Sequence, residues 1–174
     1  MRKTTMILIL ALASGWLMAQ TEPVIRDGER FTYVCLECRG PYTQVPAKLG
    51  ELMQEMAKQK LALEGPPLGV YYAALSQPAA AEPAWEVAAA VSGNPVVQPP
   101  LVIKEFSCDK QAEMTFKGSY AESGNAYPKL MAFIEQNGYK PSGPALETWL
   151  DDPSQTKPED CRTLIVIPVE KKAP

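Results

Sequence analysis

The sequence contains no histidine among its 174 residues. Histidine is the usual base of nucleophilic triads and a common zinc ligand, so its absence excludes His-based triads and His metal sites. A glycine-rich phosphate loop of the P-loop type is also missing. The paired carboxylates Asp151 and Asp152 lie at a predicted turn, where neighbours seldom converge on one substrate. We therefore expect no metal and no other cofactor, and acid–base chemistry would rest on single carboxyl groups.

The sequence also lacks a concentration of positive charge. Its formal net charge is −3, and neither a basic stripe nor a helix-turn-helix pattern is present, so nucleic acid is not an expected partner. Beyond the N-terminal region no apolar run approaches the length of a membrane span. Residues 20–174 have the length of one domain with a sizeable core, which we expect to be monomeric.

The first 19 residues have the order of a secretory signal peptide, because Arg2 and Lys3 precede the apolar run of residues 6–13. We expect cleavage after Ala19, with an earlier cut or an uncleaved N-terminal anchor as alternatives. No cysteine follows the apolar run directly, which argues against a lipoprotein. The sequence thus predicts residues 1–19 as a signal peptide and an exported chain, periplasmic or secreted, that is free of the membrane after cleavage.

Four cysteines remain in the predicted exported chain: Cys35, Cys38, Cys108 and Cys161. An even number in an oxidising compartment favours at least one long-range disulfide, and four cysteines allow three connectivities. Cys35 and Cys38 have the spacing of half a zinc site, but they lie in a strand-like run, where residues three apart point to opposite faces. That geometry argues against zinc binding and against a direct bridge between these two.

The chain contains an internal repeat with a spacing of 78 residues and no gap. Each copy has a basic residue before Gly-x-Tyr, then a helix pattern, a Gly-Pro pair and a strand pattern with a large aromatic residue. Matched pairs are Gly40/Gly118, Tyr42/Tyr120, Leu52/Leu130, Met53/Met131, Gly65/Gly143, Pro66/Pro144, Leu68/Leu146 and Tyr71/Trp149. A tandem repeat of one supersecondary unit predicts a pseudo-twofold fold with a seam between the halves, where ligand pockets commonly form.

Hydrophobic periodicity predicts the same order of elements in both copies, residues 31–92 and 101–170. In the first copy we expect strands at residues 31–38, 68–75 and 85–91, and a helix with the apolar stripe Leu49, Leu52, Met53 and Met56. In the second we expect strands at residues 101–106, 112–117, 145–150 and 163–169, and a helix that carries Tyr127, Leu130, Met131 and Ile134 and ends at Asn137-Gly138.

The predicted fold is of the α+β class, with tandem β-α-β-β units, two helices packed on antiparallel sheet and a central ligand cleft. The segments outside these elements are expected to be irregular. They are a flexible N-terminal segment at residues 20–30, a loop at 77–83, a link at 92–100 and a tail at 171–174.

These features resemble the GyrI-like small-molecule-binding domain, also known as the effector-binding domain of bacterial AraC- and MerR-type multidrug regulators. The resemblance covers residues 31–170 and rests on the order of short motifs together with the duplication. The motifs are Arg39-Gly40-Pro41-Tyr42, Gly69-Val70-Tyr71-Tyr72, Trp85-Glu86-Val87, Lys117-Gly118-Ser119-Tyr120, Asn137-Gly138-Tyr139, Gly143-Pro144 followed by Glu147 and Trp149-Leu150, and Asp152-Pro153.

The resemblance implies a cleft that binds lipophilic, often aromatic and cationic, molecules against aromatic walls and one buried glutamate, to which Glu147 corresponds. Some stand-alone members of the family are hydrolases that open cyclopropane-bearing toxins, and others interact with DNA gyrase. The predicted signal peptide argues against the gyrase role, because gyrase is cytoplasmic. The lack of a DNA-binding domain argues against a one-chain transcription factor.

The alternation of Ala145, Glu147 and Trp149 places their side chains on one face of a strand. By the repeat, Tyr71 takes the place of Trp149 and Gly69 that of Glu147, so we expect two facing aromatic rings, one acidic wall and open space opposite it. A carboxylate in an apolar pocket has a raised pKa unless a cation offsets it, and aromatic faces attract cations. A solvent-facing glutamate is the alternative.

Four further residues are candidate ligand contacts. Glu86 and Trp85 leave opposite faces of one strand, so one of the two points into the cleft. Tyr42 and Tyr120 follow glycines at matching places and either contact ligand or pack the strand-to-helix turn.

Three functions fit this sequence. The favoured one is an exported sensor or sequestration module that binds a lipophilic, aromatic small molecule, with or without a positive charge. The second is a hydrolase of reactive electrophiles that uses Glu147 as acid or base. The third is a protein that binds an unidentified protein partner and no ligand.

Overall fold

The computed structural model describes residues 21–72, 83–93 and 95–173. The predicted signal peptide and most of the predicted loop at residues 77–83 lie outside these ranges. Neither of the two α-helices in the described part of the chain has the length and apolar character that crossing a bilayer requires.

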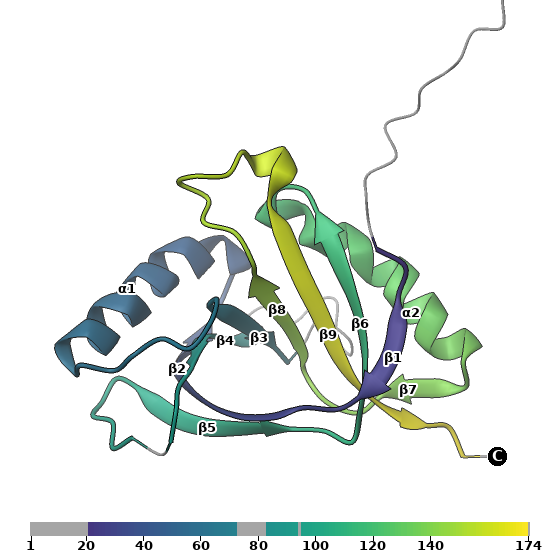
Figure 1. The fold of residues 1–174 in the computed structure, drawn as a ribbon, viewed down its shortest axis with the longest axis horizontal. Helices are drawn as coiled ribbons and strands as arrows, with labels where there is room; N and C mark the ends of the chain where they lie inside the picture. Colours follow the sequence, from purple (N-terminus) through teal and green to yellow (C-terminus); the bar gives the residue numbers. More distant parts are fainter. Residues whose placement is uncertain (1–20, 73–82, 94, 174) are drawn as a thin grey trace, which may run out of the picture.

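Nine antiparallel strands form one sheet, and two α-helices pack on one of its faces (Figure 1). The strand order is β1-β6-β9-β8-β3-β4-β2-β5, and β7 pairs with β9. The strands are β1 Val24–Asp27, β2 Arg30–Arg39, β3 Leu68–Tyr71, β4 Ala84–Ala90, β5 Val102–Ser107, β6 Lys110–Lys117, β7 Tyr139–Pro141, β8 Ala145–Trp149 and β9 Arg162–Lys171. The helices are α1 Val45–Lys58 and α2 Tyr127–Gln136, and three 3₁₀ turns are η1 Tyr42–Gln44, η2 Tyr120–Ala126 and η3 Pro158–Asp160.

The sheet repeats its own layout about the contact between β3 and β8. Moving outward from that contact, β3, β4 and β2 on one side match β8, β9 and β6 on the other. The 78-residue spacing aligns each strand with its counterpart. The predicted α+β fold with pseudo-twofold symmetry is thereby confirmed, and its seam is the antiparallel pairing of residues 68–71 with residues 145–148.

The outermost strands are exchanged between the two halves. Strand β1 lies just before the first copy but pairs with β6 of the second, whereas β5 opens the second copy and pairs with β2 of the first. The prediction that residues 20–30 form a flexible segment is therefore wrong at β1. Ile25 packs against the core and Arg26 forms an ion pair with Glu113. The 78-residue repeat could have predicted β1, because it aligns residues 24–27 with residues 102–105, which lie in a predicted strand.

The two segments that follow the exchanged strands, residues 28–29 after β1 and residues 108–109 after β5, cross in close contact. The Gly28 N–H donates to the Asp109 carbonyl at 2.9 Å, and the Cys108 N–H donates to the Glu29 carbonyl at 3.2 Å. A Cβ atom on Gly28 would lie 2.0 Å from the Cys108 carbonyl oxygen. Figure 1 shows the link from β1 to β2 and strand β5 running along the same border of the fold. The crossing therefore requires a residue without a side chain at position 28.

Both helices bury the predicted apolar stripes against the sheet. Leu52 and Met56 of α1 and Leu130 and Ile134 of α2 are buried, and the other four stripe residues are partly buried in the same cluster. Strand β4 contributes the alternate residues Trp85, Val87 and Ala89 to this core, and Val91 directly after the strand joins them, as the alternation predicted. Helix α2 ends before Gly138, whose φ of 76° suits glycine at a helix C-terminus.

The prediction of a disulfide is wrong in this structure, since all four cysteines are free. Cys35 and Cys38 belong to clusters on opposite faces of β2, as the alternation predicted. Cys108 and Cys161 precede β6 and β9, which run antiparallel, so they lie at opposite ends of that strand pair. Strand geometry therefore keeps the two thiols apart within each of these pairs, Cys35 with Cys38 and Cys108 with Cys161.

Two boundaries also differ from the predictions. Strand β3 ends at Tyr71, whereas the predicted strand continued to residue 75. Residues 73–75 of that prediction lie outside the described ranges. Strand β7 was not predicted, because three residues carry no readable alternation.

Replacing Gly28 with alanine is expected to destabilise the fold by roughly 3 kcal/mol, because the crossing backbones must separate to admit a methyl group. Gly50→Ala is the matched control. A Cβ atom on Gly50 would meet nothing within 4 Å, so this change within α1 should stabilise the protein by about 0.5–1 kcal/mol. Urea unfolding followed by circular dichroism measures both, and equal effects of the two variants would contradict the tight crossing.

Candidate functional site

Two glutamates are buried in the sheet, one on each face. The helix face is the one that α1 and α2 cover, and it holds Trp85, Glu147 and Trp149; the outer face is the opposite one, and it holds Val70 and Glu86. Glu147 is 7 % exposed and Glu86 is 1 % exposed. Burial of an ionisable side chain demands compensation, so each glutamate marks a place with a specific environment.

Glu147 lies on β8 directly opposite Gly69 of β3, at the seam between the repeats. Two hydroxyl groups, one from η2 and one from the first residue of α2, hold its carboxyl group. Ser123 Oγ donates to Oε2 at 2.8 Å, and Tyr127 Oη donates to Oε1 at 2.8 Å. The alternative of a solvent-facing glutamate is therefore wrong.

Burial raises the pKa of the Glu147 carboxyl group, and the hydrogen bonds from Ser123 and Tyr127 offset that rise only in part. Among the described residues no lysine or arginine forms an ion pair with Glu147. Burial, and then the charge of Glu147, also raises the pKa of the Tyr71 and Tyr127 hydroxyls, so both stay protonated at neutral pH. Within the described part of the chain, the site thus holds an acid with neutral partners and no counter-ion.

The ring of Tyr71 covers this acid from the first repeat. A Cβ atom on Gly69 would lie 2.6 Å from Tyr71 Oη, so the ring folds back over the glycine that faces Glu147. The predicted open space opposite Glu147 is therefore filled by an aromatic ring. Tyr42 packs edge-on against Tyr71 with ring centroids 5.1 Å apart, and its own side chain is exposed at the surface.

The second repeat has the corresponding pair of rings, Tyr120 and Trp149, with centroids 6.5 Å apart. Here the tyrosine also has a structural role. Tyr120 Oη donates to the Asp151 carbonyl at 2.5 Å and accepts from the Asp151 N–H at 3.1 Å. Tyr120 therefore fixes the turn after β8, whereas no hydrogen bond of the Tyr42 hydroxyl is seen among the described residues.

The structure brings six of the seven predicted site residues to the helix face: Glu147, Trp149, Tyr71, Trp85, Tyr42 and Tyr120. Trp85 is fully buried and donates its Nε1–H to the Gly40 carbonyl at 2.9 Å, so its role is to hold the turn before η1. Glu86 lies on the outer face and cannot join Glu147. The alternation of β4 predicted that only one of Trp85 and Glu86 would do so.

Sequence analysis missed Ser123 and Tyr127 as partners of Glu147. They are four residues apart across the junction of η2 and α2, which places both on one side of the helix. The spacing of four residues can be read from the sequence, but nothing in the sequence shows that this side of the helix faces Glu147.

Residues 21–170 match the family described as the GyrI-like small molecule binding domain. The chain belongs to this family. Ligand binding is therefore the general function of its fold. The comparison with curated proteins finds no significant match.

Solved structures support the GyrI-like fold. The C-terminal domain of EcmrR is 18% identical with a TM-score of 0.76, and the match covers 86% of this chain and 98% of that domain. In an EcmrR–DNA complex the EcmrR chain is 19% identical with a TM-score of 0.77; the match covers 90% of this chain, which spans 59% of the EcmrR chain. A Listeria innocua hydrolase is 15% identical with a TM-score of 0.58, covering 86% and 92% of the two chains. SAV2435 bound to tetraphenylphosphonium is 15% identical with a TM-score of 0.53, covering 86% and 94%.

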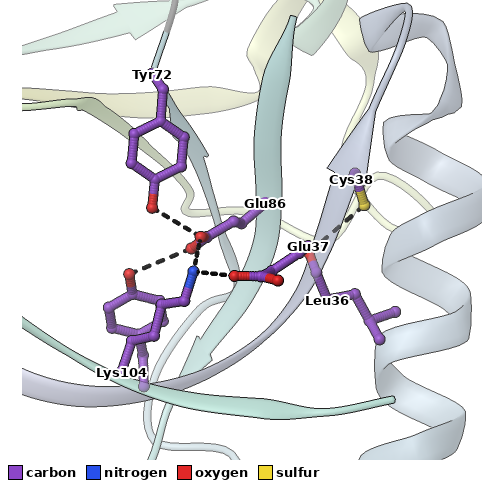
Figure 2. Close-up of polar contacts among 7 residues, drawn as sticks. Leu36, Glu37, Cys38, Tyr72, Glu86 and Lys104 are labelled. Carbon is purple, nitrogen blue, oxygen red and sulfur yellow. Dashed lines mark hydrogen bonds and ion pairs between the residues drawn. The ribbon is translucent and has the colours of Figure 1, made fainter. Parts of the chain in front are cut away.

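The second buried glutamate of this GyrI-like domain sits in a compensated cluster, drawn in Figure 2. Tyr72 Oη donates to Glu86 Oε1 at 2.7 Å and Tyr33 Oη donates to Oε2 at 3.2 Å. The Lys104 ammonium group pairs with Glu86 and also with Glu37, the latter at 2.6 Å. Unlike Glu147, Glu86 therefore has a cation beside it.

Glu147→Gln is expected to stabilise the domain at pH 8 by about 1 kcal/mol or more, because the raised pKa means that the folded state must hold an unfavourable charge. As the pH falls through the raised pKa towards the ordinary carboxyl range, Glu147 takes up its proton and the difference disappears. Thermal unfolding from pH 4 to pH 8 measures this. The exposed Glu122→Gln is the control, and a glutamine variant less stable at pH 8 would contradict an uncompensated charge.

Lys104→Met is expected to cost roughly 2 kcal/mol or more, because it leaves Glu86 buried without its cation. Lys58→Met removes a surface ion pair with Glu55 and should change stability by less than about 0.5 kcal/mol. Adding Glu86→Gln to Lys104→Met should restore part of the loss. Chemical unfolding of the three variants measures these differences, and absence of rescue would show that Lys104 acts through packing alone.

Proposed function

We propose that this chain binds lipophilic, aromatic cations at the Glu147 site, as an exported sensor or sequestration module. The observation that carries the proposal is a buried carboxyl group whose partners are two neutral hydroxyls. A cation brought to this place supplies the charge that the fold leaves out, and in a low-dielectric site that attraction is strong.

The surrounding rings suit the apolar part of such a ligand. Tyr71 and Tyr42 form an edge-on pair of rings. Tyr71 is buried, whereas Tyr42 is 40% exposed at the surface. Under this proposal the ligand displaces the Tyr71 ring from above Gly69 and packs against the aromatic side chains of the site. Aromatic faces contribute about 0.5–2 kcal/mol each toward a cation.

The asymmetry of the site gives the ligand an orientation. The acid and its hydroxyl partners all come from the second repeat, and the position matching Glu147 in the first is Gly69. The charged end therefore lies toward α2 and the flat body toward η1. SAV2435, a fold neighbour, was solved with tetraphenylphosphonium, which is a lipophilic aromatic cation.

Calorimetric titration of residues 20–174 with tetraphenylphosphonium and the neutral triphenylphosphine oxide tests the proposal. The cation should bind more tightly, and Glu147→Gln should weaken the cation at least about tenfold while leaving the neutral ligand nearly unchanged. Affinity for the cation should rise as the pH rises through the raised pKa of Glu147, because the carboxylate then forms. Failure of both ligands, with a folded protein, would favour the partner-binding alternative.

A hydrolase is the second candidate, and the raised pKa of Glu147 is the observation that favours it. A carboxyl group with a raised pKa keeps its proton to higher pH than an ordinary one and can then protonate a leaving group, and Tyr127 Oη at 2.8 Å can relay a proton. A fold neighbour from Listeria innocua is a hydrolase. Under this alternative Glu147→Gln keeps binding of a cyclopropane-bearing electrophile but abolishes formation of its ring-opened product, measured by mass.

A further inference from the structure

The outer face of the sheet contains a hollow of about 860 Å³ that lies on the other side of the sheet from Glu147. Its floor and walls come from β2, β3, β5 and β9 and from the segment between β7 and β8. The lining includes Tyr33, Tyr72, Lys104, Phe106, Pro144 and Pro168. A volume of this order is typical of small-molecule sites.

The floor of the hollow is built on Glu86. The three groups that donate to this carboxylate, from Tyr33, Tyr72 and Lys104, all line the hollow. A phenol has one O–H to donate, and both tyrosines donate theirs to Glu86. Towards a ligand their oxygens can therefore act only as acceptors. The Lys104 ammonium group has three N–H donors, of which Glu86 and Glu37 take two. The floor therefore offers two acceptors and one donor.

Charge does not select the occupant of this hollow. The charged lining residues are largely matched by ion pairs within the fold, and the buried Glu86 has its own cation. These pairs are Lys104–Glu86, Lys110–Asp27, Arg30–Glu105 and Lys140–Glu170. The two charged lining residues outside these pairs, Asp109 and Lys171, have opposite signs, so the described lining carries no excess charge that would attract an ion.

The walls provide flat apolar surface. Phe106, Pro144 and Pro168 line them with apolar side chains. Tyr72 is 44% exposed, so solutes reach the floor from solvent. Aromatic and proline faces favour a planar ligand.

We propose that this hollow is a second binding site, separate from Glu147, for neutral planar molecules that carry an amide-like pair of donor and acceptor. The amide N–H donates to the oxygen of Tyr72 or Tyr33, and the amide carbonyl accepts from Lys104. The ring packs between Phe106 and the two prolines. The site recognises hydrogen-bond pattern, whereas the Glu147 site recognises charge.

A matched series of one-ring probes tests this proposal: benzamide, N,N-dimethylbenzamide, benzoate and benzylammonium. Titrations are followed by amide chemical shifts of the labelled protein. Benzamide should cause saturable shifts at Lys104, Phe106 and Gly143, and it should bind about threefold to tenfold more tightly than the other three probes. The dimethyl amide lacks the N–H donor, benzoate is charged, and benzylammonium is charged and lacks the carbonyl. Preference for benzylammonium or benzoate, equal binding of the dimethyl amide, or no saturable shift at these residues would overturn the proposal.

Tyr72→Phe removes one acceptor and keeps the ring, so benzamide should bind about fivefold more weakly. Tyr42→Phe is the same chemical change on the helix face and should leave benzamide binding unchanged. Equal losses in the two variants would overturn the assignment. If Tyr72→Phe does not fold, nuclear Overhauser contacts between benzamide and Phe106 in the unaltered protein decide the question, and their absence would overturn it too.

Discussion

The crossing of two backbone segments at Gly28 is the constraint on which the fold depends. Each half of the sheet receives its edge strand from the other half, so the two copies cannot separate without withdrawing a paired strand. The crossing holds only because the Gly28 backbone can lie against the Cys108 carbonyl group, with hydrogen bonds on both sides of the contact. Between these edge strands, the seam pairs β3 with β8 in a register that sets Glu147 opposite Gly69.

A near-symmetric fold produces an asymmetric pair of sites. The duplication supplies matching rings, Tyr42 with Tyr71 and Tyr120 with Trp149, on the two sides of the seam. The polar groups have no such counterparts, because Glu147 faces a glycine. Divergence of a few side chains on a conserved frame is thus enough to give a ligand site a direction.

The two buried glutamates differ in how their charge is balanced. Glu147 has hydroxyl partners from Ser123 and Tyr127, which soften the cost of burial without cancelling the charge. Glu86 has Lys104 beside it. The same side chain, buried to a similar degree in one sheet, therefore favours a cation in one place and serves as part of a neutral framework in the other.

The sequence by itself determined the duplication, the helix stripes, the α+β class and the face of β8 that carries Glu147, because these follow from short-range periodicity and from an ungapped repeat. It also separated Trp85 from Glu86, since a strand alternates. Only the tertiary structure decided the exchange of β1 and β5, the placing of Ser123 and Tyr127 on Glu147, and the pairing of Lys104 with Glu86. Each of these joins residues distant in the chain, and such contacts depend on strand register and on the crossing at Gly28, which no local pattern encodes.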